Sequence, residues 1–341
     1  MGADPVAPLS PRLTPYPRRD NPRRGIFMAT VSNAQDDAKL LFTGPSPFGG
    51  HRYDLFDLCP RRYGLTYEKN PLPIVGEDGQ LVSYAPSAVQ DDSDDADEPQ
   101  EIAWALIRGT YVHTGLAHHY AIRRGQQQGK PANIYQPVEA VRALHSYDCD
   151  ADPHNADIYT EALKVTEKVV TAYMAKYAFE RAKVIVVEEV FTLRLGESQA
   201  PYTFRLDLAL QDNEGKVWMT DHKTTSRRLR DHGKIYGIST QFQAYAVGGQ
   251  AVYGHNYGGI VVNMLEIPED NSPIKFDRPK TPGVPGFLAE FPERIERIFK
   301  TMTALVYSGL PVQRWPRRTG YGSCFAFRRP CPFYETCRHQ P

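Results

Sequence analysis

The sequence has no net charge and no long apolar run, and these two absences exclude several classes of protein. Forty basic residues balance forty acidic ones among the 341, so no global positive field draws nucleic acid to the whole surface. No apolar stretch approaches the length that crosses a bilayer. The arginines near the N-terminus are not followed by the apolar segment of a secretory signal. We therefore expect an intracellular, cytoplasmic protein whose charges act locally.

Cysteine is scarce, and neither a disulfide framework nor an ordinary zinc knuckle is expected. Without a secretory signal, disulfides are not expected, and the absence of any Cys-x-x-Cys pair argues against a zinc knuckle. Cys331-Pro332 repeats the dipeptide Cys59-Pro60, and proline after cysteine is common around iron–sulfur clusters. The five cysteines are Cys59, Cys149, Cys324, Cys331 and Cys337.

Hydrophobic periodicity predicts helices, then a strand meander, then a helix, a strand and a helix. Val165, Val169, Tyr173 and Tyr177 form one stripe of the helix expected over 155–181. This order predicts an α/β fold with a mixed central β-sheet flanked by helices, a helical N-terminal insertion and a C-terminal cysteine cluster. We expect helices near 102–124, 155–181, 239–250 and 285–308, and strands near 184–195, 201–211, 216–222 and 257–266.

The N-terminal third lacks such periodicity. Residues 1–38 are rich in proline and arginine and are expected to form a flexible tail, with Met28 as an alternative start. Residues 39–341 would form the folded domain. Within it, 45–98 is loop-rich, and the acidic run over 91–98 is expected to be an exposed linker.

Two acidic residues and a lysine carry the strongest chemical signal. Residues 202–224 are expected to form two β-strands joined by a turn at 212–215. A hairpin sets its strands side by side, so Asp207, Asp221 and Lys223 can converge on one face. Two carboxylates hold a hard divalent cation, and a nearby lysine orients a water or neutralises charge on a phosphate. This pattern indicates a metal-dependent phosphodiesterase.

The apolar surroundings of both acids favour a metal site over surface ion pairs. Leucines flank Asp207 on both sides, and Trp218-Met219 precedes Asp221. Residues in such a context are usually at least half buried, and a buried acid requires a cation or strong hydrogen-bond donors.

Five motifs in a fixed order give the chain a resemblance to a known family. They are a Gly-x-x-x-His helix, a Glu, an Asp and an Asp-x-Lys on successive strands, and a Gln-x-x-x-Tyr helix. The set, over about residues 40–341, resembles the PD-(D/E)XK nuclease superfamily, and within it the RecB-like branch with four cysteines. That branch includes CRISPR-associated four-cysteine exonucleases and AddB-type nuclease domains, and it implies a restriction-endonuclease-like core. The matching residues are Gly109-Thr-Tyr-Val-His113, Glu188 or Glu189, Asp207, Asp221-His-Lys223 and Gln241-Phe-Gln-Ala-Tyr245.

The resemblance implies that His113, Asp207 and Asp221 bind Mg²⁺ or Mn²⁺, with the main-chain carbonyl of His222 as a further ligand. A histidine among oxygens moves the preference towards Mn²⁺. Lys223 would orient the attacking water and stabilise charge on the phosphate.

Two further assignments follow from the same resemblance. Gln241 and Tyr245 lie one helical turn apart on one face, where they would steady Lys223 or touch the DNA strand. For the acid of the first strand, alternation says only that Glu188 and Glu189 face opposite sides, and the family spacing favours Glu188.

The resemblance also points to one [4Fe–4S] cluster, held by a cysteine far upstream and three near the C-terminus. The chain departs from the family pattern, because six residues rather than two separate the second and third of these cysteines. Zinc is the alternative metal. The cluster would close the domain and take no part in hydrolysis. Its ligands would be Cys59, Cys324, Cys331 and Cys337, and Cys149 would be free.

We therefore expect a metal-dependent DNA nuclease, an exonuclease acting on single strands or duplex ends. The alternative is a partner-dependent or non-catalytic DNA-binding subunit of a helicase–nuclease or other DNA-processing complex. No Gly-x-x-x-x-Gly-Lys-Ser/Thr loop occurs, so a helicase motor would be another chain. Two basic clusters could contact phosphates along the substrate path or could be solvated surface. They are Arg227, Arg228 and Arg230, and Arg317, Arg318, Arg328 and Arg329.

Overall fold

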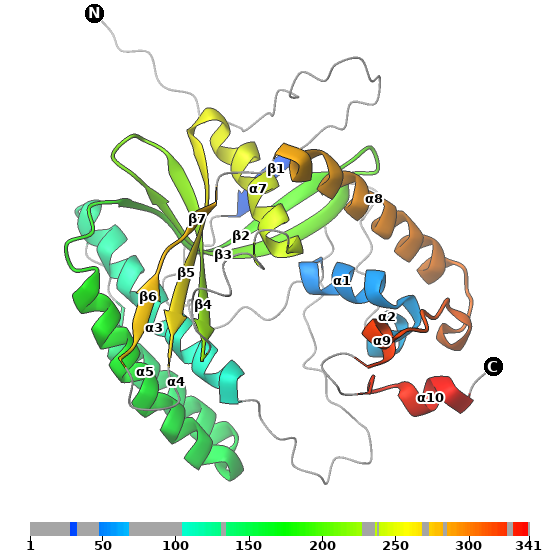
Figure 1. The fold of residues 1–341 in the computed structure, drawn as a ribbon, viewed down its shortest axis with the longest axis horizontal. Helices are drawn as coiled ribbons and strands as arrows, with labels where there is room; N and C mark the ends of the chain where they lie inside the picture. The colour runs from blue at the N-terminus through cyan, green and yellow to red at the C-terminus, as the bar shows by residue number, and fades with distance from the viewer. Residues whose placement is uncertain are drawn as a thin grey trace, which may run out of the picture.

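The computed structural model contains a mixed β-sheet with helices on both faces, which confirms the predicted fold class (Figure 1). The part of the chain that the structure describes consists of residues 28–32, 48–67, 104–130, 134–226, 236, 239–267, 273–281, 285–325 and 330–339. None of the helices in these ranges is both long and apolar enough to cross a membrane.

Within those ranges the sheet has seven strands in the order β1-β2-β3-β4-β5-β6, and β7 also pairs with β5. The β4–β5 pair is parallel and every other pair is antiparallel. A parallel neighbour requires a crossover connection, and here the crossover contains helix α7. The strands are β1 Met28–Ser32, β2 Lys183–Leu195, β3 Ala200–Gln211, β4 Val217–Thr225, β5 Tyr257–Glu266, β6 Lys275–Asp277 and β7 Lys280–Thr281.

Two groups of helices cover the two faces of this sheet, and four small α-helices lie nearer the two ends of the described chain. Helices α3, α4 and α5 lie together on one side, and α7 and α8 lie on the other (Figure 1). The main helices are α3 Trp104–Gln127, α4 Pro137–Ala151, α5 Ala156–Lys176, α7 Thr240–Tyr253 and α8 Pro285–Tyr307. The small ones are α1 Gly50–Leu58, α2 Pro60–Thr66, α9 Tyr321–Cys324 and α10 Tyr334–His339.

Each face of the sheet has its own apolar core. The core under α7 and α8 includes Phe204, Leu206 and Phe291. The core under α3 and α5 includes Leu208, and the predicted stripe of α5 packs there through Val169 and Tyr173, both buried. Leu206 and Leu208 therefore belong to different cores, and Asp207 lies between them.

The predicted strands and the helices near 102–124, 239–250 and 285–308 agree with the structure to within a few residues. The helix expected over 155–181 ends earlier, at Lys176, and Tyr177 caps it. Helix α4 was not predicted, although its start carries standard signals: Pro137 at the first turn, and Glu139, which accepts a hydrogen bond from the Gln136 N–H.

The N-terminal third differs more from expectation. Met28–Ser32 lies inside the expected flexible tail but forms β1, because the antiparallel edge of β2 supplies its hydrogen-bond partners. The segment expected to be loop-rich contains α1 and α2, which bury Tyr53, Phe56 and Tyr63 in the core under α7 and α8. The acidic run over 91–98 and the remainder of the tail lie outside the described residues.

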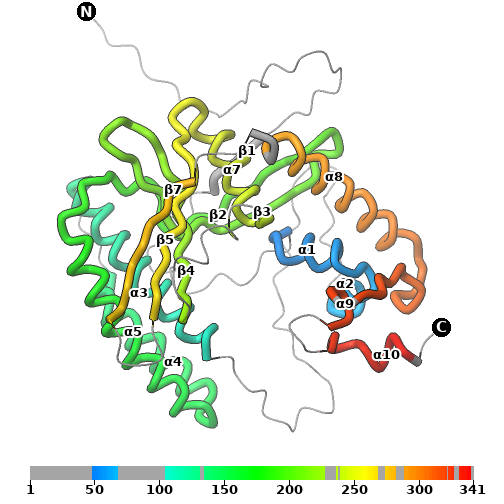
Figure 2. Tube along the Cα trace, viewed as in Figure 1, coloured from blue at the N-terminus to red at the C-terminus, as the bar shows by residue number. Residues whose placement is uncertain are grey.

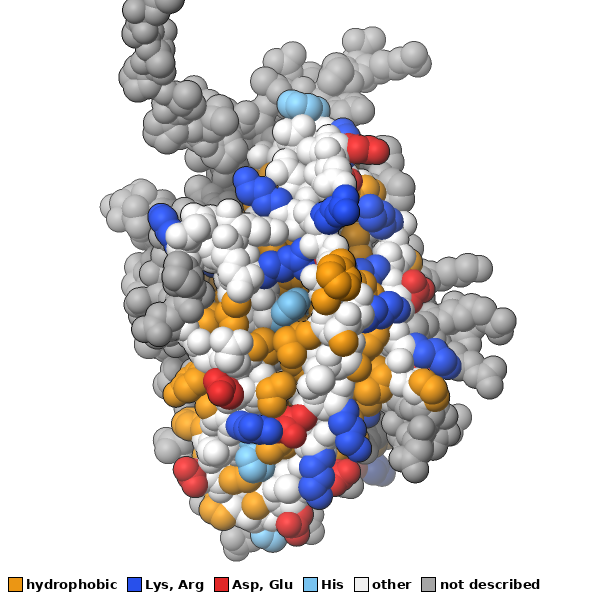
Figure 3. Space-filling model, turned by 90° about the vertical axis from the view of Figure 1, so that its left-hand side faces the viewer, with side chains coloured by type: hydrophobic (Ala, Val, Ile, Leu, Met, Phe, Trp, Pro, Cys, Tyr) orange, Lys and Arg blue, Asp and Glu red, His pale blue; other side chains and the backbone are white. Residues whose placement is uncertain are grey.

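The face of the molecule in Figure 3 carries basic, acidic and apolar side chains in a mixed pattern, which agrees with the balanced composition. The few large apolar side chains that are well exposed are scattered, for example Tyr147 on α4 and Phe179 after α5. Scattered apolar residues are normal on a protein surface.

Two glycines of α3 provide a test of the packing between α3, α4 and α5. A Cβ on Gly115 would lie 2.6 Å from Val170 and 3.2 Å from Val141, whereas a Cβ on Gly109 would meet only Thr224, at 3.6 Å. Both changes to alanine gain similar helix propensity. We expect Gly115→Ala to be less stable than Gly109→Ala by at least about 1 kcal/mol, because overpacking opposes that gain. Urea unfolding of both variants measures the difference, and equal stabilities would contradict this packing.

Candidate active site

Asp207 and Asp221 lie where strands β3 and β4 separate. The registered pairs of the ladder stop at Leu208–Thr220, so the next residue along each strand is one of the two acids. In place of a ladder bond, Asp207 Oδ2 accepts a hydrogen bond of 2.8 Å from the His222 N–H. Asp207 is 8% exposed and Asp221 only 1%. Both are therefore buried, as their apolar neighbours indicated.

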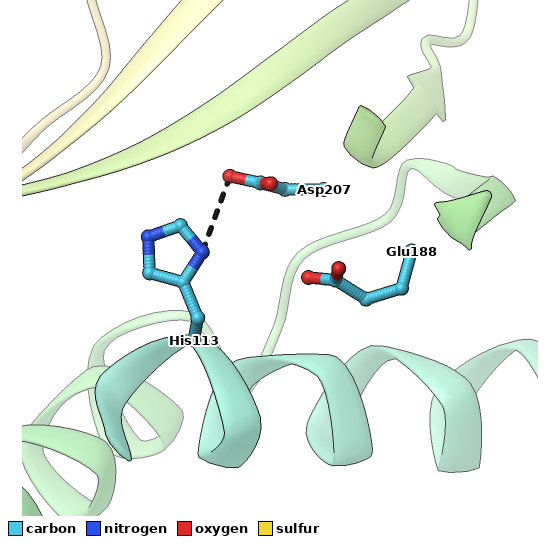
Figure 4. A group of neighbouring side chains, drawn as sticks. All are labelled: His113, Glu188 and Asp207. Atoms are coloured by element: carbon cyan, nitrogen blue, oxygen red, sulfur yellow. Dashed lines mark ion pairs between the residues drawn. The ribbon is translucent and has the colours of Figure 1, made fainter. Parts of the chain in front are cut away.

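His113, Glu188 and Asp207 point toward one another from three different elements (Figure 4). His113 comes from α3, Glu188 from β2 and Asp207 from β3. Each offers one ligand atom, and these atoms lie within 4.8 Å of one another. Of the residues that the structure describes, this is the one group of His, Cys, Asp and Glu side chains with such a spacing.

The backbone at Glu188 turns this side chain into the group. Glu188 has φ 49°, in the left-handed region that a non-glycine residue seldom adopts, and such strain concentrates at functional sites. Its Oε2 lies 3.0 Å from Arg205 Nε. Glu189 instead pairs with Arg124 of α3, at 3.0 Å. The structure therefore brings Glu188 to Asp207 and leaves Glu189 outside the group.

Arg205 was not identified from the sequence. It stands two residues before Asp207 on the same strand, so period-two alternation could have assigned both side chains to one face.

The His113 ring bridges two oxygens that the sequence assigned to a cation. Its Nδ1 lies 3.4 Å from Asp207 Oδ2, and its Nε2 lies 2.9 Å from the His222 main-chain oxygen. Three of the four predicted metal-binding groups are therefore in direct contact. In this arrangement both nitrogens of His113 face oxygen atoms.

The fourth predicted ligand, Asp221, lies outside the group formed by His113, Glu188 and Asp207, and its carboxylate contacts other residues. Its Oδ2 is 2.7 Å from Lys223 Nζ. Its Oδ1 faces Gln241 Nε2 at 2.9 Å and the Tyr245 hydroxyl at 3.0 Å. Gln241 also accepts a hydrogen bond of 3.0 Å from Lys223 through Oε1. Helix α7 thus holds both the acid and the lysine of the Asp-x-Lys motif.

Burial, mutual repulsion and neighbouring histidines together shift the pKa values of the three carboxyl groups in different directions. Burial, with the Asp207 charge beside it, raises the pKa of Glu188 to about 8 against the opposing effect of Arg205. Burial and Asp207 also raise the pKa of Asp221 to about 6, although Lys223 opposes the shift. Burial would raise the pKa of Asp207, but the neighbouring His113 and His222 outweigh it and the pKa is lowered. Like charges this close cannot all be ionised without a cation.

Two neighbouring groups complete the electrostatics of the site. Burial lowers the pKa of His222 to about 3, so its ring is neutral near pH 7. Burial alone would lower the pKa of Lys223, but the Asp221 carboxylate outweighs burial and raises it. Lys223 therefore keeps its proton in this arrangement.

The upstream and downstream cysteine segments lie together (Figure 2). On α2, Arg61 donates from its main-chain N–H to the Pro316 oxygen at 3.1 Å and from Nε to the Trp315 oxygen at 3.0 Å. The Cys331 N–H donates to the Cys324 oxygen at 2.7 Å.

The cysteine side chains do not meet as ligands of a single ion. Within the ranges that the structure describes, no three cysteine sulfurs lie within 4.8 Å of one another. Cys59 is buried between α1 and α2. Cys149 stands apart on α4, where its Sγ lies 3.3 Å from His145 Nε2.

Of the two predicted basic clusters, only Arg317 and Arg318 lie within the described residues. Arg317 donates to the Cys337 oxygen at 2.8 Å, and Arg318 lies 3.6 Å from Asp57 Oδ1. These two arginines therefore make contacts within the cysteine-bearing segments. Arg227, Arg228, Arg230, Arg328 and Arg329 lie outside the described residues.

Comparison with known proteins gives one informative match. A family model described as the PD-(D/E)XK nuclease superfamily matches residues 51–338. No curated protein matches the chain. Among solved structures, a crystal structure of a candidate exonuclease from Eubacterium rectale is similar at 11% sequence identity, covering 72% of this chain and 94% of that one, with a TM-score of 0.32. A TM-score this low supports no argument about function.

The raised pKa values predict how a divalent cation affects stability. Glu188 and Asp221 titrate at lower pH when unfolded, so their stabilising contribution is lost as pH rises through about 6 to about 8. A cation that binds the ionised carboxylates offsets this loss. We expect Mn²⁺ to raise the midpoint of thermal unfolding, and to raise it more at pH 8 than at pH 6. Glu188→Gln should reduce this rise in the midpoint. An unchanged midpoint on addition of Mn²⁺ at pH 8 would contradict a cation site at these residues.

Proposed function

Because this chain belongs to the PD-(D/E)XK nuclease superfamily, we propose that it is a Mg²⁺- or Mn²⁺-dependent deoxyribonuclease that digests DNA from its ends. The observation that carries the proposal is the convergence of Glu188, Asp207 and His113 on one point beside Asp221 and Lys223. The choice of DNA, and of single-stranded or duplex ends, rests on the resemblance to the four-cysteine exonucleases.

The donor set of this site fits a hard divalent cation. Glu188 and Asp207 supply oxygen, His113 supplies one nitrogen, and the His222 carbonyl faces the same group. Oxygen donors suit Mg²⁺, and the imidazole moves the preference towards Mn²⁺. Asp221 would join as a ligand by exchanging its contact with Lys223. A bound cation would neutralise negative charge on the phosphate and would lower the pKa of a water bound to it.

In this proposal Lys223 acts as a donor rather than as a base. It keeps its proton because the Asp221 carboxylate raises its pKa. A protonated amine can orient a water by donating a hydrogen bond to the water oxygen. It can also stabilise negative charge that develops on a phosphate oxygen. Gln241 and Tyr245 hold Asp221 Oδ1, so Oδ2 is directed toward Lys223 and is the oxygen that would be exchanged to the cation. These two residues would therefore position the motif and need not touch DNA.

We also propose a [4Fe–4S] cluster between the two cysteine segments. The contacts of Arg61 with the chain at Trp315 and Pro316 support it, because they hold the Cys59 segment against the C-terminal one. A four-iron cluster is larger than a single ion, so its thiolates lie farther apart than the ligands of one zinc ion. No three cysteine sulfurs of the described residues lie within 4.8 Å of one another, and this spacing disfavours a zinc site more than a cluster.

Lys223→Met tests the nuclease proposal. We expect cleavage of end-labelled single-stranded DNA to fall on the order of 100-fold or more, because a donor to the developing charge is lost. Mn²⁺ binding should persist, since Lys223 is not a ligand. Lys216→Met is the matched control, because Lys216 directly precedes the same strand and donates to the His255 oxygen, outside the site. Equal cleavage by both variants would contradict the proposal.

Circular single-stranded DNA in the same assay tests the preference for ends. An exonuclease leaves the circle intact while it degrades the linear strand, and loss of the circle would indicate an endonuclease. Wild-type protein that binds Mn²⁺ but cleaves neither substrate would favour the partner-dependent subunit instead.

Iron content tests the cluster. Anaerobically purified protein is expected to contain about four irons per chain and to absorb broadly near about 400 nm. Cys331→Ser should lose both signals, because it removes a thiolate ligand. Cys149→Ser should keep them, because Cys149 contacts His145 on a different part of the molecule. Colourless wild-type protein with zinc, or with no metal, would contradict the cluster.

A further inference from the structure

A buried polar network lies behind His222, on the face of the sheet that α3 and α5 cover. Its members come from elements that are far apart in the sequence, and hydrogen bonds connect them into one unit. They are Tyr120 on α3, Tyr173 on α5, Glu180 between α5 and β2, His222 on β4, Asn263 on β5, and Arg278 between β6 and β7.

Asn263 is the link between this network and His222. Its Nδ2 lies 2.6 Å from His222 Nδ1 and 2.8 Å from the Tyr173 hydroxyl, and its Oδ1 accepts from Arg278 Nε at 3.1 Å. A guanidinium can only donate, so the amide oxygen must face Arg278 and the amide nitrogen must face His222. His222 Nδ1 is therefore an acceptor, and the ring proton lies on Nε2. The network thus selects one tautomer of His222.

Arg278 fixes Asn263 in turn. Its guanidinium donates to the Tyr120 hydroxyl at 2.6 Å, also donates to the Tyr173 hydroxyl and pairs with Glu180. Its Cζ lies 3.5 Å from the centroid of the Tyr177 ring. Because its guanidinium nitrogens donate on several sides and the Tyr177 ring packs against it, the Arg278 side chain has little freedom to move.

The main chain of His222 contacts the candidate active site directly, and the His222 ring also lies edge-on to that of His113, 5.6 Å between centroids. Its N–H donates to Asp207, and its carbonyl oxygen contacts His113. Its side chain thus binds the network while its peptide groups bind two residues of the site. The stacking of Tyr120 on the His222 ring, 6.2 Å between centroids and 15° between planes, adds a further restraint.

We propose that Asn263 and Arg278 are positioning residues of the active site. Through the His222 ring they set where the N–H and carbonyl of His222 lie, and so hold Asp207 and the carbonyl oxygen in the geometry that a divalent cation requires. This inference rests on the proposed metal-dependent function. An apolar set of side chains of similar volume would stabilise the fold as well as a buried ionic network does, or better. Stability alone therefore does not account for the network.

Asn263→Asp is the sharpest test, because at nearly constant shape it replaces the amide nitrogen, a donor, by a charged carboxylate oxygen, an acceptor. The carboxylate offers His222 Nδ1 an acceptor in place of a donor, so the ring proton moves to Nδ1. Ring ¹⁵N chemical shifts of histidine-labelled protein report this change, with His222→Asn to assign the signals. Mn²⁺ affinity, measured by calorimetry without DNA, should fall on the order of 10-fold, as it does when other outer partners of a metal site are changed.

Arg123→Met is the matched control for Arg278→Met. Arg123 pairs with the same carboxylate, at 3.2 Å from Glu180 Oε2, and within the described residues it forms no hydrogen bond or ion pair with Asn263 or His222. We expect Arg278→Met to weaken Mn²⁺ binding, as Asn263→Asp does, while Arg123→Met retains wild-type affinity. If Arg278→Met does not fold, Arg278→Lys, which keeps the charge without the planar fork, replaces it.

Unchanged ring shifts and unchanged Mn²⁺ affinity in Asn263→Asp and in the Arg278 variant would overturn the inference. Equal losses of affinity in the Arg123 and Arg278 variants would also overturn it, because the network would then act through stability. Failure of the proposed function is a separate result: wild-type protein would neither bind Mn²⁺ nor cleave DNA. The tautomer of His222 would still decide whether the network orients that residue.

Discussion

The crowding of buried carboxylates at the fork between β3 and β4 is the constraint on which the other features depend. Asp207 and Asp221 occupy the first positions beyond the ladder, and the strained backbone at Glu188 adds a third acid. Isolated buried charges of one sign are strongly unfavourable. The neighbouring residues relieve this repulsion: Lys223 pairs with Asp221, and the His222 N–H donates to Asp207.

The two faces of the sheet contribute different kinds of partner. Helix α3, on one face, supplies His113 to the Glu188–Asp207 side of the site. Helix α7, on the other face, supplies Gln241 and Tyr245 to Asp221. Each helix is fixed by its own apolar core. The site is therefore built at the boundary of two cores, where side chains from both layers can reach the same pair of strands.

Much of this arrangement could be predicted from the sequence, because the strands and the main helices have clear periodicity and the motifs stand in a fixed order. The choice of Glu188 over Glu189 could not be derived from alternation, since a left-handed backbone residue interrupts the regular strand. No local sequence pattern indicates the network around Asn263, because its residues come together only through tertiary packing. Helix α4 carried recognisable start signals that were not used.

The parallel pairing of β4 with β5 has a consequence for how the protein acquires activity. That pairing depends on α7 as its crossover, and the contact between His113 and His222 spans 109 residues of chain. Contacts of such sequence separation form late, because the closure of long loops must precede them. During synthesis His113 emerges long before its partners. The growing chain would thus lack the candidate active site until the segments from α3 to β5 had been translated and had folded together.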